Sequence, residues 1–222
     1  MSYSFESVVE GINIIQSEFP YYNKDKLRDE YSGQEYSIQM IEKSLERLRD
    51  KERIFNNFLK IVIFDCLIGN SDRHHSNWGI SHVLKEDTKM RTYYLDNTPL
   101  YDNGSSLCAY VNEKDIDNIL EDKLRFESLI NTKSKSVIGW WNIRPIRHFE
   151  LLENIYNSSI DNEVILQFIL NLKLKVNEES IKRLINEFSD DIISVKMKKL
   201  LNKYIMERRN KILEIYHMKG DV

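Results

Sequence analysis

The chain has 222 residues, of which 41% are hydrophobic and 30% are charged, and its formal net charge is −3. This length and composition predict one sizeable hydrophobic core, in a single domain or at most two. The charge offers no basic surface for direct binding of nucleic acid, and the sequence contains neither a membrane-spanning apolar run nor a signal pattern. With only Cys66 and Cys108 no disulfide scaffold is indicated, so we expect a cytoplasmic protein.

Helical spacing of apolar residues dominates the first third of the chain. The pattern over residues 5–19 predicts an amphipathic helix that ends at Pro20, and polar residues 23–34 are expected to form a loop or a short charged helix. From Tyr36 onward the spacing predicts two further helices with a break near Asp50. The second of these becomes apolar on nearly all sides, so we expect it to be buried in the middle of the domain.

The rest of the chain is expected to contain one β-hairpin and a helical tail. Residues 78–84 and 90–95 are predicted strands, and their hairpin would bring Asp102 back beside Asn77. Later helices are predicted at residues 115–129, 146–156, 161–172, 178–188 and 190–216. We therefore expect a mainly α fold over residues 1–222, divided into N-terminal helices (1–54), a site-bearing segment (55–110) and a helical tail (111–222).

Three polar residues have the order and spacing of a phosphoryl-transfer site. Asp72 and Asn77 are separated by four residues, and Asp102 follows beyond the predicted hairpin, in an Asp-Asn-Gly sequence. Phosphoryl transfer needs a carboxylate that orients the attacking hydroxyl and oxygen ligands that hold magnesium on the phosphates. Asp72 is expected to accept the hydroxyl proton, while Asn77 and Asp102 are expected to bind Mg²⁺ and, through it, ATP.

The motif Asp72-Arg73-His74-His75-Ser76-Asn77 resembles the D-R-H-x-x-N loop of HipA-like serine/threonine kinases, which phosphatidylinositol lipid kinases share. The apolar lead-in at residues 64–70 and the segment at 99–107 favour the HipA-like proteins, whose metal segment is P-x-Y-D. Lipid kinases typically have Asp-Phe-Gly where this chain has Asn103. The resemblance covers residues 55–110 well and implies an ATP- and Mg²⁺-dependent protein kinase, with a protein substrate and a toxin-antitoxin or effector setting.

Neighbouring loop residues are expected to support the site. Asn70 is predicted to position the catalytic loop, and His74 to anchor it near the γ-phosphate, where protein kinases carry a lysine. Arg73 is expected to brace the loop against a buried carboxylate, for which Asp65 is a candidate. A transition-metal site at His74 and His75 is disfavoured, because adjacent residues point in different directions and no second ligand pair converges on them.

The sequence lacks the features of a kinase N-terminal lobe. The short stretch before Asp72 contains no glycine-rich strand-turn-strand and no strand lysine. The chain therefore resembles a C-terminal lobe, and we expect a partner chain to supply the other lobe, docking on apolar residues of 1–20 and on the hairpin that begins at Trp78. The alternatives are a catalytically silent kinase-like binding module and a lipid kinase, which should present a cationic membrane-facing surface.

Overall fold

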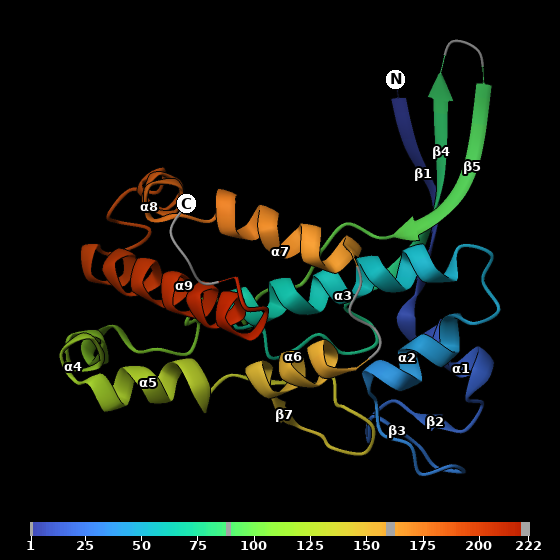
Figure 1. The fold of residues 1–222 in the computed structure, drawn as a ribbon, viewed down its shortest axis with the longest axis horizontal. Coiled ribbons are helices and arrows are strands. Elements are labelled where there is room, and N and C mark those ends of the chain that lie inside the picture. Colours follow the sequence, from blue (N-terminus) through green and yellow to red (C-terminus); the bar gives the residue numbers. More distant parts are fainter. Residues whose placement is uncertain (1, 88–89, 159–162, 219–222) are drawn as a thin grey trace. The chain divides into compact units, whose positions relative to one another are not determined.

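A computed structural model describes residues 2–87, 90–158 and 163–218 (Figure 1). These residues form two compact units, each assembled from separate stretches of the sequence. The first draws on Met1–Ile61, Asp72–Asn103 and Val137–Ile146, and the second on Val62–Ser71, Gly104–Ser136 and Arg147–Val222. Within the described ranges no helix is both long enough and apolar enough to cross a membrane. The division into three segments at 1–54, 55–110 and 111–222 stays a prediction.

The first unit contains a three-stranded antiparallel sheet of order β1-β4-β5 (Figure 1). Strands β4 (Gly79–Asp87) and β5 (Met90–Asn97) form the predicted hairpin, whose turn includes residues 88–89 outside the described chain. The sheet is larger than the sequence indicated, because β1 (Ser2–Glu10) adds a third strand along β4.

The helix predicted over residues 5–19 is wrong in its first half. The chain is extended as β1 and becomes helical only at α1 (Gly11–Glu18). Apolar spacing in this segment is compatible with a helix, but β4 supplies backbone partners in a register that pairs Val8 with Ser81 and Val9 with Ile80. Because these partners are distant in the sequence, local periodicity could not reveal them.

Polar residues 23–34 also differ from expectation, since they form neither an open loop nor a helix. Strands β2 (Tyr22–Asn23) and β3 (Arg28–Asp29) pair as a small antiparallel ribbon. The Asp29 side chain accepts from the backbone and hydroxyl of Ser32, at 2.7 and 2.8 Å. These bonds satisfy backbone groups locally, as Asx turns do.

Helices α2 (Ile38–Leu45) and α3 (Lys51–Ile68) confirm the predicted pair and the break near Asp50. Ser37 caps α2 by accepting from the backbone of Met40, which satisfies a helix N–H that has no intrahelical partner. The Trp78 side chain is 1% exposed and packs on Phe58, with ring centroids 4.9 Å apart. Trp78 is therefore a core residue, and its side chain is not available to a partner at the expected docking surface of residues 1–20 and the hairpin.

The second unit is helical, and α9 (Val195–Ile215) contacts most of its other helices (Figure 1). These are α4 (Ile116–Glu121), α5 (Lys123–Asn131), α6 (His148–Asn157), α7 (Glu163–Lys175) and α8 (Glu178–Asn186). Short elements are η1 (Glu113–Asp115), β6 (Lys135–Ser136) and β7 (Ile146–Arg147).

Two expected helices in this unit have different limits. The helix predicted at 115–129 is interrupted at Asp122, whose side chain caps α5 by accepting from the backbones of Leu124 and Arg125. The last helix begins at Val195, after the capping residue Ser194, rather than at Asp190. In both cases a polar side chain binds the backbone N–H groups of a new helix start, which apolar spacing alone does not register.

A buried cation joins two helix ends to α9 in the second unit. Arg208 has no exposed side-chain surface and donates to the carbonyl oxygens of Cys66, at 2.5 Å, and Ile130, at 2.8 Å. Both carbonyls belong to the last turn of a helix, where acceptors lack intrahelical donors and the dipole favours positive charge. Arg208 therefore fixes the end of α3, the helix that leads into the predicted catalytic loop.

Candidate active site

The catalytic loop is introduced by a glycine turn at the end of α3. Gly69 has a φ of +71°, a conformation that L side chains rarely adopt. The backbone N–H of Asn70 donates to the Asp65 carbonyl at 2.9 Å, which closes the helix in a Schellman arrangement. A Cβ on Gly69 would lie 1.9 Å from the Tyr204 hydroxyl, so glycine is also required for close packing.

Asn70 is locked into this turn rather than presented to a ligand. Its side chain is buried, and Nδ2 donates to Asp65 Oδ1 at 3.0 Å. The Asn70 carbonyl lies 2.8 Å from His148 Nε2, and the other imidazole nitrogen lies 3.0 Å from the Ser134 hydroxyl. These bonds fix Asn70 within the turn, and its expected role in positioning the loop stays a prediction.

His148 is a contributor to the turn that sequence reasoning missed. Burial, followed by the nearby Arg208 charge, lowers the pKa of His148 to about 3, so its imidazole is neutral. Both ring nitrogens lie near a carbonyl oxygen, which only accepts: Nε2 is 2.8 Å from that of Asn70, and Nδ1 is 3.2 Å from that of Ser134. A neutral imidazole carries one proton and donates to one of the two. As a lone histidine at the start of a helix, His148 carried no signal of this contact in the sequence.

In the first unit Arg73 ties the loop to the segment that contains Asp102. Arg73 is 1% exposed, and its Nη1 donates to the carbonyls of Asn77 and Tyr101, each at 2.8 Å. Its Nη2 donates to Asn103 Oδ1 at 2.6 Å. Both chain neighbours of Asp102 are therefore bound to the same guanidinium that binds Asn77, which brings the metal segment beside the loop.

The side chains of Asn77 and Asp102 fit a hard-cation site. Asn77 Nδ2 donates to the Asp72 carbonyl at 2.7 Å, so the amide is fixed, and among the described residues none donates to its Oδ1. Asp102 is exposed, and its φ of +51° turns its backbone out of the usual strand and helix conformations. An amide oxygen and a carboxylate are the donors that Mg²⁺ accepts while keeping several waters.

The exposed Asp72 side chain lies in the same loop, one residue before Arg73. Its backbone carbonyl is the group that holds Asn77, so the two predicted site residues are linked directly. Searched over the described part of the chain, no group of three or more His, Cys, Asp and Glu residues has the arrangement of a metal site. A Mg²⁺ site at Asn77 and Asp102 would have a different donor set, with one amide and one carboxylate.

The two loop histidines have different surroundings. His75 is buried, and its Nδ1 lies 3.0 Å from the Tyr22 hydroxyl. Burial and, second, the neighbouring His74 lower the pKa of His75 to about 4. His74 is half-buried, and its Nδ1 accepts from the backbone of Ser76 at 3.2 Å. His75 therefore anchors the loop to the core, while His74 is partly accessible to solvent and its expected place near the γ-phosphate stays a prediction.

Acidification is expected to destabilise both units through these neutral histidines. The folded pKa values, about 4 for His75 and about 3 for His148, lie below the ordinary value of about 6.5, so the unfolded chain binds protons first. The free energy of unfolding is therefore unaffected by protonation of these two histidines above about pH 6.5, and it falls progressively as the pH decreases toward 3. Urea unfolding at pH 7, 5.5 and 4.5 measures it.

The pH prediction is tested with a substitution of His148 and with a control substitution of His217, which is exposed. His148→Gln should unfold at lower urea concentration than wild type at pH 7 and should lose less stability on acidification, whereas His217→Gln should retain the wild-type pH slope. Identical slopes for wild type and His148→Gln would show that His148 is not the neutral, buried group described above.

Asn70→Ala is expected to reduce turnover more than stability. The substitution removes the bond to Asp65 and frees the turn that leads into Asp72, and displacement of a catalytic atom by about 1 Å can cost on the order of a hundredfold in rate. Turnover with Mg-ATP and urea unfolding should be measured on the same preparation. A lowered unfolding midpoint with unchanged turnover would contradict this role for Asn70.

Comparisons with known proteins agree with a kinase-like fold. No family model matches the chain. Among curated proteins it is similar to the serine/threonine-protein kinase CtkA of Helicobacter pylori, with 22% identity over 163 residues, which are 73% of this chain and 46% of that protein. The chain thus spans less than half the length of this relative. The crystal structure of the H. pylori proinflammatory kinase CtkA superposes with a TM-score of 0.72 at 17% identity, over 98% of this chain and 71% of that chain. The chain shares a kinase fold.

Proposed function

We propose that the chain is a serine/threonine protein kinase of the HipA-like type that transfers the γ-phosphate of ATP to a protein hydroxyl. The observation that carries the proposal is the Arg73 guanidinium, which binds the loop of Asp72 and Asn77 and both neighbours of Asp102. This side chain holds together two segments that lie apart in the sequence, on either side of the β4-β5 hairpin, which supports a shared phosphoryl-transfer site. Similarity to a serine/threonine kinase supports the same chemistry.

Each residue has one role in the proposed reaction. Asp72 accepts the proton of the substrate hydroxyl, and Asn77 Oδ1 and the Asp102 carboxylate are the groups that would hold Mg²⁺ on the phosphates of ATP. Bound Mg²⁺ supplies neutralisation of the phosphate charge. His74 faces the ligand side of the loop, while Arg73, Asn70 and His148 keep the loop in position.

We also propose that full activity requires a strand-rich lobe supplied by a separate chain, in keeping with a toxin-antitoxin or effector setting. In the described residues, strand β1 forms one edge of the sheet, and its Val8 and Val9 are 57% and 37% exposed. An edge strand with exposed apolar side chains can accept another strand, because its outer backbone groups are unpaired within the sheet. Within the docking surface expected at residues 1–20 and the hairpin, this proposal assigns the docking element to β1.

Mg-ATP binding by the purified chain tests the proposed site without requiring turnover. Titration followed by NMR is expected to give weak binding that depends on Mg²⁺, with AMP as the control that lacks the triphosphate. Absence of any Mg²⁺-dependent difference between ATP and AMP would reject the site. Micromolar ATP affinity together with rapid phosphorylation of protein substrates by this chain alone would instead reject the requirement for a partner lobe.

A further inference from the structure

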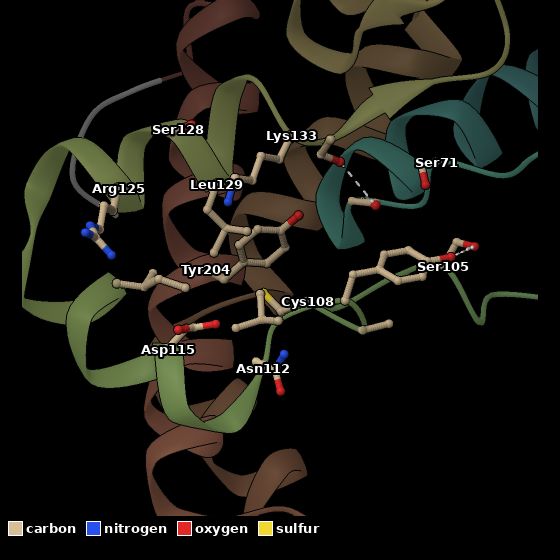
Figure 2. A pocket seen from close by; sticks show the side chains of 16 residues that line it. Ser71, Ser105, Cys108, Asn112, Asp115, Arg125, Ser128, Leu129, Lys133 and Tyr204 are labelled. Atoms are coloured by element: carbon tan, nitrogen blue, oxygen red, sulfur yellow. Dashed lines mark hydrogen bonds between the residues drawn. The ribbon is translucent and has the colours of Figure 1, made fainter.

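The second unit contains a pocket of about 490 Å³ beside the ends of both site-bearing segments (Figure 2). One wall is made by Gly69 and Ser71, and another by Ser105 and residues 108–112. Ser71 directly precedes Asp72 in the chain, about 3.8 Å away from Cα to Cα. Ser105 follows Asp102 by three residues, so both walls are continuous in sequence with the proposed catalytic segments.

The wall that follows Asp102 has a defined backbone conformation. Leu107 and Cys108 both have positive φ angles, of 53° and 61°. The Leu107 N–H donates to the carbonyl of Ile68 at 2.8 Å, which binds this segment to the end of α3. Such left-handed conformations in non-glycine residues are costly and persist only where surrounding contacts hold them. The pocket is therefore a formed feature of the unit.

The floor of the pocket is apolar, and Lys133 provides a cation at its side. Cys108, Ile119, Leu129 and Tyr204 are all buried and line it. Figure 2 shows the Lys133 amine directed into the pocket beside Leu129. Lys133 is exposed, and no carboxylate of the described chain lies within ion-pair distance of it.

The other charged groups of the pocket are placed differently. Arg125 lines the pocket, but its Nε lies 3.3 Å from the Asp122 carboxylate, so its charge is already compensated. Asp115 is the one carboxylate among the described lining residues, and Figure 2 shows it on the other side of the Tyr204 ring from Lys133. An anionic group is therefore favoured at the Lys133 side and disfavoured near Asp115.

We propose that this pocket binds an acidic side chain of the protein substrate, glutamate in particular, within a few residues of the phosphorylated serine or threonine. The aliphatic stem of a glutamate would cover Leu129 and the Tyr204 ring, and its carboxylate would pair with Lys133. An extended peptide advances about 3.3 Å per residue, so an acceptor at Asp72 places nearby side chains at this pocket. The proposal rests on the proposed kinase function and adds the substrate class to it.

Serine-centred degenerate decapeptide pools, each with Glu, Gln or Lys fixed at one flanking position, test the proposal. Phosphorylation of the pools is measured with the wild-type chain. Binding of fluorescein-labelled pools is measured separately, by fluorescence polarisation without ATP, with both the wild-type chain and the Asp72→Asn variant. We expect a preference for Glu over Gln of about 1.5- to fivefold at one position or more, the range for a solvent-accessible ion pair.

Substitutions of Lys133 decide whether the preference arises in the pocket. Lys133→Ala should abolish it and Lys133→Glu should shift it toward the Lys pools, while Lys135→Ala, two residues away and outside the pocket lining, should retain it. A Glu preference that survives in Lys133→Ala, or no preference in wild type, would overturn the subsite.

The two readouts separate this proposal from the kinase proposal. A Lys133-dependent binding preference without phosphorylation of any pool would leave the subsite standing and count against kinase activity of this chain by itself. Phosphorylation whose peptide preference ignores Lys133 would leave the kinase function standing and remove the subsite.

Discussion

Asp72→Asn should reduce phosphate transfer by about 10²- to 10⁴-fold, the contribution typical of a positioned general base. The substitution keeps the size of the side chain and leaves the backbone carbonyl, through which residue 72 holds the Asn77 amide at 2.7 Å. Because the lost group is the proton acceptor and not a metal ligand, Mg-ATP affinity should remain close to that of wild type. Transfer from γ-labelled ATP and ATP titration on one preparation measure both quantities.

Asp102→Asn is the informative comparison, because it removes a proposed Mg²⁺ ligand instead of the base. It should weaken Mg-ATP binding itself, and raising the Mg²⁺ concentration should recover part of the loss. Asp191→Asn, an exposed carboxylate of the second unit, should leave both activity and affinity unchanged. Equal, measurable transfer by wild type and Asp72→Asn would reject Asp72 as the base.

The elements that the sequence predicted well are those specified by local physics. Residues 58–68 are apolar on nearly all sides, and α3 is a core helix at those positions; the strands of the hairpin follow from alternation and turn residues. The failure at β1 has the opposite origin. Whether residues 2–10 form a strand is decided by β4, and their own spacing of apolar residues is equally compatible with a helix.

In the candidate site, likewise, the residue types could be recognised in the sequence, whereas their surroundings in the fold could not. The spacing of Asp72, Asn77 and Asp102 was visible in the sequence because the chemistry requires those residue types in that order. The partners of Arg73 were not, since two of them are backbone carbonyls, which every residue possesses. His148 was invisible for a related reason: its role depends on burial against Asn70, which lies 78 positions earlier in the chain.

Arg73→Lys should be among the most damaging conservative substitutions in the protein. Nη1 of Arg73 serves the carbonyls of Asn77 and Tyr101 while Nη2 serves Asn103, and a lysine amine cannot reproduce this planar fork. Buried acceptors left without a donor cost about 1–3 kcal/mol of folding stability. We therefore expect a clear fall in the urea unfolding midpoint and a loss of turnover on the order of a hundredfold.

The effect on Mg-ATP distinguishes this role from simple destabilisation. Since Arg73 holds both neighbours of Asp102, Arg73→Lys should also weaken Mg-ATP binding under conditions in which the variant is fully folded, as Asp72→Asn should not. Arg49→Lys, at an exposed arginine, provides the matched control and should change none of the three measurements. Normal Mg-ATP affinity in folded Arg73→Lys would mean that the Asp102 segment keeps its place without the guanidinium, and that the link between loop and metal segment lies elsewhere.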